Sequence, residues 1–82
     1  MLDVKIPIFD AVGTWENITK LRKQKHLSVR EIQEVFGFET PQAIYKWQHG
    51  SAMPTIENLA ILAAIFEVKV DDILVFHEQQ VA

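Results

Sequence analysis

The amino-acid sequence predicts an all-α fold, a bundle of five short helices. Residues that favour the N-cap, the position just before the first helical residue, precede apolar patterns at Ser28, Thr40 and Thr55. Within these patterns apolar residues recur three or four positions apart, the period of a helix with one buried face. Gly37 and Gly50 follow two of the patterns, and glycine is favoured there because many helices end in a left-handed residue.

The length of 82 residues suits a single domain, which we expect over residues 10–76. Pro7 opposes a regular helix near the start, so residues 1–9 are expected to form an extended arm. The polar end of the chain, residues 77–82, is expected to be a frayed tail.

The first helix is expected to begin near Asp10 or Thr14 and to run to about Lys25. Its apolar residues fall at helical spacing and are Ala11, Trp15, Ile18 and Leu21. The second helix begins at a capping box, in which Ser28 is the N-cap and Glu31 stands three positions later. Its expected buried face consists of Ile32, Val35 and Phe36.

The third helix is expected over residues 40–49, with Thr40 as its N-cap and Pro41 at the first helical position. Thr55 is expected to cap a fourth helix, whose core stripe comprises Ile56, Leu59, Leu62, Ala63 and Phe66. A short fifth helix follows, because Asp71 and Asp72 suit the positive end of a helix dipole.

Composition argues against several classes of function. The chain has no cysteine, and its three histidines, at positions 26, 49 and 77, do not have metal-ligand spacing. No nucleophile and base are paired in a recognisable pattern, so we expect no enzyme, no cofactor, no metal and no small-molecule substrate. The longest apolar run, residues 59–66, is too short for a membrane span, and no secretory signal is visible. A cytoplasmic protein of bacterial type is the simplest expectation.

The charge of the chain is unevenly distributed. The formal net charge is −3, yet residues 20–30 carry five cations and no acid. Lys20, Lys23 and Lys25 in this segment would supply a positive field to a bound polyanion. A solvated helix face explains the same segment about equally well when it is taken alone.

Two short helices joined by a glycine-containing turn form the helix-turn-helix pattern, whose second helix enters the major groove. A helical projection of residues 40–49 places Ile44 and Trp47 on the inner side. Nearly all side chains on its outer side can form hydrogen bonds, and the Gln42 amide can pair with an adenine edge through two of them. The expected groove-facing set is Gln42, Ala43, Tyr45 and Lys46. The expected phosphate contacts are Thr40, Ser28, Arg30 and His49.

Residues 14–75 resemble a helix-turn-helix domain of the Cro/phage-repressor type, the xenobiotic-response-element family. The matching positions are Ile18, Leu21, Arg22, Leu27, Ser28, Ile32, Ile44, Trp47, Gly50, Pro54, Leu59, Leu62, Ala63, Phe66, Val68, Asp71, Asp72 and Leu74. The resemblance implies a five-helix domain that binds operator DNA as a transcriptional regulator, commonly as a homodimer. Ile61, Ile65, Val75 and Phe76 are apolar residues that could supply a dimer surface.

The sequence departs from the family pattern at three places. Val29 and Gln48 stand where the family often has glutamine and glutamate, and Glu39 lengthens the turn between the two helices. Gln48 can still accept a hydrogen bond from Arg22, with a weaker electrostatic contribution. These departures keep open an alternative, a helix-turn-helix module that binds another protein and has weak or no affinity for DNA.

Overall fold

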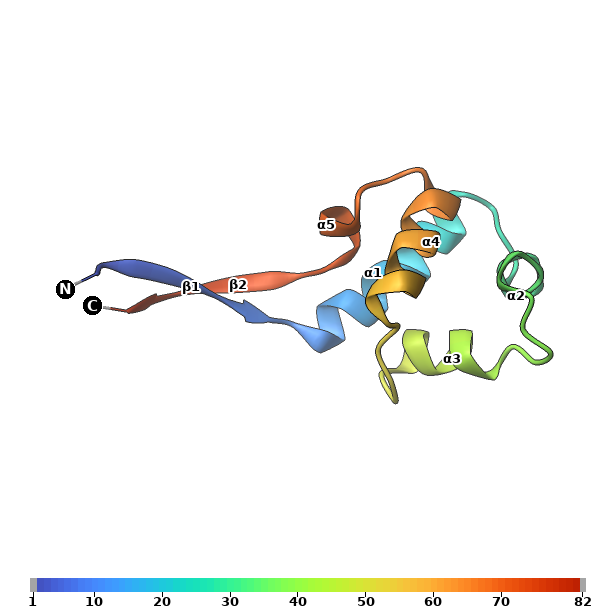
Figure 1. The fold of residues 1–82 in the computed structure, drawn as a ribbon, viewed down its shortest axis with the longest axis horizontal. Coiled ribbons are helices and arrows are strands. Elements are labelled where there is room, and N and C mark those ends of the chain that lie inside the picture. Colours follow the sequence, from blue (N-terminus) through green and yellow to red (C-terminus); the bar gives the residue numbers. More distant parts are fainter. Residues whose placement is uncertain (1, 82) are drawn as a thin grey trace.

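The computed structural model describes residues 2–81 and consists of a helical body with a β-ribbon projecting from it (Figure 1). Met1 and Ala82, the outer ends of the expected arm and tail, lie outside the described residues. The principal dimensions are 50 × 24 × 20 Å, because the ribbon extends the long axis. In chain order the elements are β1 (Val4–Phe9), α1 (Ala11–Gln24), α2 (Val29–Phe36), α3 (Gln42–His49), α4 (Ile56–Phe66), α5 (Val70–Ile73) and β2 (Phe76–Val81).

The five helices of the sequence prediction are present, but the fold is not purely α-helical. Strands β1 and β2 pair antiparallel, with Val4 opposite Val81 and Phe9 opposite Phe76. The expectation of a frayed C-terminal tail is therefore wrong for residues 77–81. The cause is long-range pairing, since the polar residues of β2 are held by a strand from the other end of the chain.

The hydrophobic core lies where α1, α2, α3, α4 and α5 meet. Its buried apolar residues are Ile18, Ile32, Ile44, Trp47, Leu59, Leu62, Ala63, Phe66 and Ile73. Two residues expected in it are outside: the exposed fractions are 63% for Val35 and 85% for Ile56. Each lies at the margin of its helical stripe, and the helices packed against α2 and α4 cover only the centres of those stripes.

A cluster of polar contacts joins the ribbon to the body. The buried hydroxyl of Thr14 donates to the Asp10 carbonyl (2.8 Å) and accepts the backbone N–H of Val75 (2.9 Å). The Asp10 side chain caps α1 by accepting the N–H of Gly13 (2.8 Å), and its other oxygen lies 2.7 Å from Nε2 of His77. The first turn of α1 is thereby tied to both strands where the ribbon begins.

Acid titration tests the contribution of Asp10. The Gly13 hydrogen bond, and secondly the hydrogen bond to His77, hold the pKa of the Asp10 carboxyl below its ordinary value. A lowered pKa stabilises the folded state above the unfolded pKa, near 4, and this stabilisation is lost as the pH falls through the folded pKa. We predict that Asp10→Asn, which keeps a neutral cap acceptor, lowers the free energy of unfolding at pH 7. The difference from the parent should shrink progressively below about pH 4.

Urea unfolding between pH 7 and pH 2.5 measures this difference. Asp71→Asn is the control, because Asp71 is an exposed aspartate that makes no side-chain hydrogen bond within residues 2–81. A difference that stays constant across the pH range would show that the charge of Asp10 contributes nothing.

Candidate nucleic-acid interface

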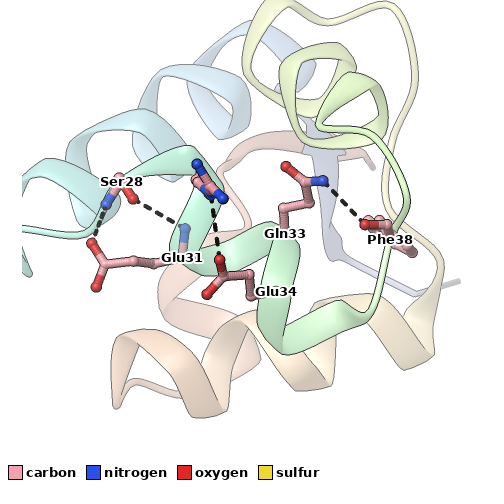
Figure 2. Close-up of polar contacts among 6 residues, drawn as sticks. Ser28, Glu31, Gln33, Glu34 and Phe38 are labelled. Carbon is pink, nitrogen blue, oxygen red and sulfur yellow. Dashed lines mark hydrogen bonds and ion pairs between the residues drawn. The ribbon is translucent and has the colours of Figure 1, made fainter.

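The start and end of α2 are set by local hydrogen bonds (Figure 2). The Ser28 hydroxyl accepts the N–H of Glu31 (3.0 Å), and the Glu31 carboxylate accepts the N–H of Ser28 (3.0 Å), which confirms the predicted capping box. These two bonds hold the pKa of the Glu31 carboxyl below its ordinary value, the Ser28 backbone N–H contributing most. Gly37 ends the helix in the left-handed conformation, with φ of 72°, as predicted.

The turn between α2 and α3 spans residues 37–41 and is fastened at Phe38. The Phe38 N–H donates to the Gln33 carbonyl (3.2 Å), and the Gln33 side-chain amide donates to the Phe38 carbonyl (3.1 Å; Figure 2). This turn is longer than the three or four residues usual for the motif. The two bonds give the longer turn a fixed path despite its length.

Aromatic packing fixes α3 beneath that turn. The rings of Phe36 and Phe38 are stacked with centroids 4.9 Å apart, and both meet the buried ring of Trp47 edge to face. Edge-to-face and offset stacked pairs are the favoured aromatic geometries, and they resist rotation of the rings past one another. The sequence analysis did not assign Phe38 a role, because the contact depends on the path of the turn.

Arg22 ties the end of α1 to both helices of the motif. Its Nε donates to the side-chain oxygen of Gln48 (2.9 Å), and a terminal guanidinium nitrogen donates to the Leu27 carbonyl (2.9 Å). The predicted bond between Arg22 and Gln48 is therefore present. Because Gln48 lies in the last turn of α3 and Leu27 immediately precedes the cap of α2, one guanidinium orients both helices.

The end of α3 packs closely on α1. Gly50 follows the helix with φ of 80°, and a Cβ atom at this position would collide with the ring of Trp15. Only glycine meets both requirements, since it alone tolerates positive φ at low cost and has no side chain. The indole N–H of Trp15 also points at the sulfur of Met53 (3.1 Å), which holds the turn that follows α3.

The start of α3 differs from the sequence prediction by one residue. Pro41, rather than Thr40, is the N-cap, and no side chain caps the helix. The first intrahelical bond runs from the Tyr45 N–H to the Pro41 carbonyl (3.1 Å), so Thr40 lies one position too early to reach the amides that it was expected to cap. Gln42 becomes the first helical residue instead of the second. The leading N–H groups of α3 have no side-chain acceptor within residues 2–81, and such groups are suited to phosphate oxygens.

Three of the four predicted groove-facing residues lie on the exposed side of α3, together with His49, and the fourth does not. Gln42, Tyr45, Lys46 and His49 are exposed, whereas Ala43 is half-buried and packs on the core. The rings of Tyr45 and His49, one turn apart, stack with an interplanar angle of 19°. The face therefore offers an amide, a phenol, an ammonium and an imidazole, all groups that can donate hydrogen bonds to bases or phosphates.

The predicted phosphate contacts on α2 already have partners within the chain. Ser28 takes part in the capping box, and the exposed Arg30 side chain pairs with Glu34 at 3.4 Å. An exposed pair of this kind is worth little and can exchange for a phosphate at small cost. Thr40 and Glu39 are exposed in the turn beside them.

The basic segment is less available than its charge suggests. Arg22 is half-buried in the contacts described above, and Lys25 lies 3.9 Å from Glu67. Lys20 and Lys23 are exposed on α1, and the structure shows no acid paired with either of them among the residues it describes. The positive charge of the basic segment that is available to a bound polyanion therefore comes mainly from these two lysines.

Within residues 2–81 no group of three or more histidine, aspartate or glutamate side chains lies close enough to bind a metal ion. No helix in that range is long and apolar enough to cross a membrane.

The turn, the anchored second helix and its exposed polar face define the class: this is a helix-turn-helix domain. The profile of the family described as Helix-turn-helix matches residues 18–73, and the chain belongs to this family, the Cro/phage-repressor or xenobiotic-response-element type. Domains of this family bind DNA and regulate transcription. Comparison with curated proteins and with solved structures gives no match for the chain.

Two substitutions at Gln48 test the Arg22 contact. We predict that Gln48→Ala lowers the free energy of unfolding by about 1 kcal/mol, because a half-buried guanidinium loses one acceptor. Gln48→Glu should give a protein at least as stable as the parent, because a bond between two charged groups is stronger. Urea denaturation at neutral pH measures both effects. Equal stability of all three proteins would show that the Leu27 carbonyl alone satisfies Arg22.

Proposed function

We infer that this protein is a sequence-specific transcriptional regulator that reads the major groove of double-stranded DNA with α3. The observation that supports this most is the two-sided character of α3. Ile44 and Trp47 are buried on one side, and four hydrogen-bonding side chains are exposed on the other. The exposed side chains can hydrogen-bond to base edges, and the width of the helix suits the major groove.

Each residue of the α3 face has a role in the proposal. Gln42 reads a base, because its amide has an acceptor and two donors that match adenine N7 and N6. Half-buried Ala43 lets the backbone approach the groove, and Lys46 and Tyr45 reach a base or a phosphate. Regulation follows from occupancy, either by blocking a promoter or by recruiting another factor, and no catalytic step is involved.

The phosphate contacts come from the start of the motif. Thr40, Ser28, Arg30 and His49 are proposed to bind the backbone of the DNA, together with the leading N–H groups of α3. One α3 helix covers only a few base pairs, so we propose that two copies bind as a homodimer to half-sites about 10 base pairs, or a multiple, apart.

Substitution of Gln42 tests base reading. A good two-bond contact is worth roughly 1–3 kcal/mol of discrimination. We predict that Gln42→Ala weakens binding to a selected operator by about tenfold or more. Affinity for random DNA and the melting temperature should hold, because the side chain is exposed. The operator comes from selection of bound genomic fragments, and fluorescence anisotropy measures both affinities.

Gln24→Ala is the matched control, an exposed glutamine in the last turn of α1 that should change neither affinity. Equal loss on operator and random DNA would assign Gln42 to the phosphate backbone. Unchanged binding on both would remove α3 from the reading surface.

Salt dependence tests the electrostatic part. The logarithm of affinity falls with the logarithm of salt concentration at about −0.9 per phosphate neutralised. We predict that replacing Lys20 and Lys23 by glutamine weakens binding to every DNA sequence alike and makes the slope less steep by up to about 1.8. Lys5→Gln, an exposed lysine of the ribbon, should leave the slope unchanged. An unaltered slope in the double variant would make the α1 lysines a solvated face.

A second candidate function is supported by exposed apolar residues outside the α3 face. Val35 on α2 and Ile56 on α4 are largely exposed, and a module that binds another protein would use such residues. Retention of a protein partner that persists at high salt, together with no discrimination between operator and random DNA, would favour this alternative.

A further inference from the structure

The two faces of the β-ribbon differ in chemical character. Val4, Ile6 and Ile8 share one face of β1, because side chains alternate along a strand, and their exposed fractions are 41%, 41% and 45%. These three residues are called the aliphatic stripe below. On the opposite face, Lys5 and Glu78 form an ion pair at 3.9 Å, whereas the ionisable pair on the stripe's own face, Asp10 and His77, lies at the end next to α1.

The ribbon stands apart from the helical body (Figure 1). About two fifths of each side chain in the aliphatic stripe is exposed, although β-branched side chains are favoured in strands chiefly because they pack against neighbours. A two-stranded ribbon is marginally stable in water, and further strands or a packed surface are needed to make it persist. A contact that covers the aliphatic stripe would therefore stabilise the ribbon.

The edge of β1 is protected against addition of another strand. The Asp10 N–H donates to the Val75 carbonyl (2.8 Å), which marks Asp10 and Val75 as a hydrogen-bonded pair of the ladder. Such pairs alternate with non-hydrogen-bonded ones, so the backbone of Pro7, opposite Glu78, faces the free edge. Proline has no N–H to offer there, and proline on an edge strand discourages pairing. Association by strand addition at the edge of β1 is therefore disfavoured.

We propose that the aliphatic stripe is the contact with a second copy of this chain, stripe against stripe across a two-fold axis. The stripe is self-complementary: with the ribbons crossed antiparallel, Ile6 lies near the axis and Val4 of one copy approaches Ile8 of the other. The described β2 residues on this face are Gln79 and His77, and His77 is engaged with Asp10. The ionisable groups on this face, Asp10 and His77, are paired with each other and do not call for an acidic or basic partner.

The position of the ribbon suits a DNA-binding dimer. The ribbon extends from one end of the molecule and α3 lies in the body towards the other, so paired ribbons leave both α3 faces accessible (Figure 1). Six residues of strand extend over roughly 20 Å, which makes the contact small, and we expect a dissociation constant on the order of micromolar. The contact extends the proposed function but does not depend on it, because dimerisation is measured without DNA.

Sedimentation equilibrium of the full chain tests the proposal. The parent should dimerise in the micromolar range, and Ile6→Asp should raise the dissociation constant by at least about a hundredfold, because it places an unpaired charge in the contact of each copy. Ile61→Asp is the comparison variant: Ile61 has a similar exposed fraction, 38%, and belongs to the other apolar surface that could supply a dimer contact, so it should leave the dissociation constant unchanged if the stripe is the contact. A monomeric parent at 100-fold higher concentration, on the order of 0.1 mM, or equal dissociation by both variants, would overturn the proposal.

A second measurement covers the case in which Ile6→Asp merely unpairs the ribbon. The chain has no cysteine, so a single introduced thiol reports contact with its symmetry mate. Under mild oxidation Ile6→Cys should form a disulfide-linked dimer at least about tenfold faster than Lys5→Cys, whose side chain is on the opposite face. Equal rates for the two variants would place the contact elsewhere. If Ile6→Asp still binds the operator more tightly than random DNA, base reading by α3 is intact, whatever the variant does to dimerisation. The ribbon contact and the proposed reading of DNA can therefore fail independently.

Discussion

The burial of Ile44 and Trp47 is the constraint on which the rest of the site depends. Both side chains are almost completely inaccessible, so the rotation of α3 about its axis is fixed. Turning the helix by one position, or 100°, would expose one of them and bury a polar side chain without a partner, and both changes are costly. The polar face formed by Gln42, Lys46 and their neighbours is exposed as a consequence. The proposed recognition surface is thus the reverse side of the core.

Two further restraints keep α3 from sliding along its own axis. At its start, the bonds between Gln33 and Phe38 hold the turn, and the Phe38 ring contacts the Trp47 ring edge to face. At its end, Arg22 holds Gln48, and Gly50 fits under Trp15. The helix has only eight residues, too few to be stable alone in water, so its conformation comes from these tertiary contacts. Rigid support of this kind lets a short helix present side chains in a fixed register to bases.

How far the sequence predicts the structure depends on how local each signal is. The Ser28 capping box and the Thr55 cap were predicted correctly, because each bond closes within three residues. The prediction of Thr40 as the N-cap was wrong by one residue. Pro41 can stand either at the N-cap or at the first helical position, and the path of the preceding turn determines which of the two it takes. Strand β2 could not be predicted, since its polar sequence pairs with a strand more than sixty residues away. DNA contacts by individual α3 residues remain predictions, because they depend on a partner.

The distribution of charge suggests how affinity and specificity are divided in this domain. Lys25 and Arg30 each lie beside a glutamate, so the positive field of the basic segment is smaller than the sequence count implies. A weak field lowers affinity for all DNA equally and leaves base contacts as a larger share of operator binding. Such a domain gains affinity more effectively from a second reading helix than from more lysines. The proposed dimer contact on the stripe face of the ribbon, away from the DNA, would supply that second helix without adding positive charge to the domain.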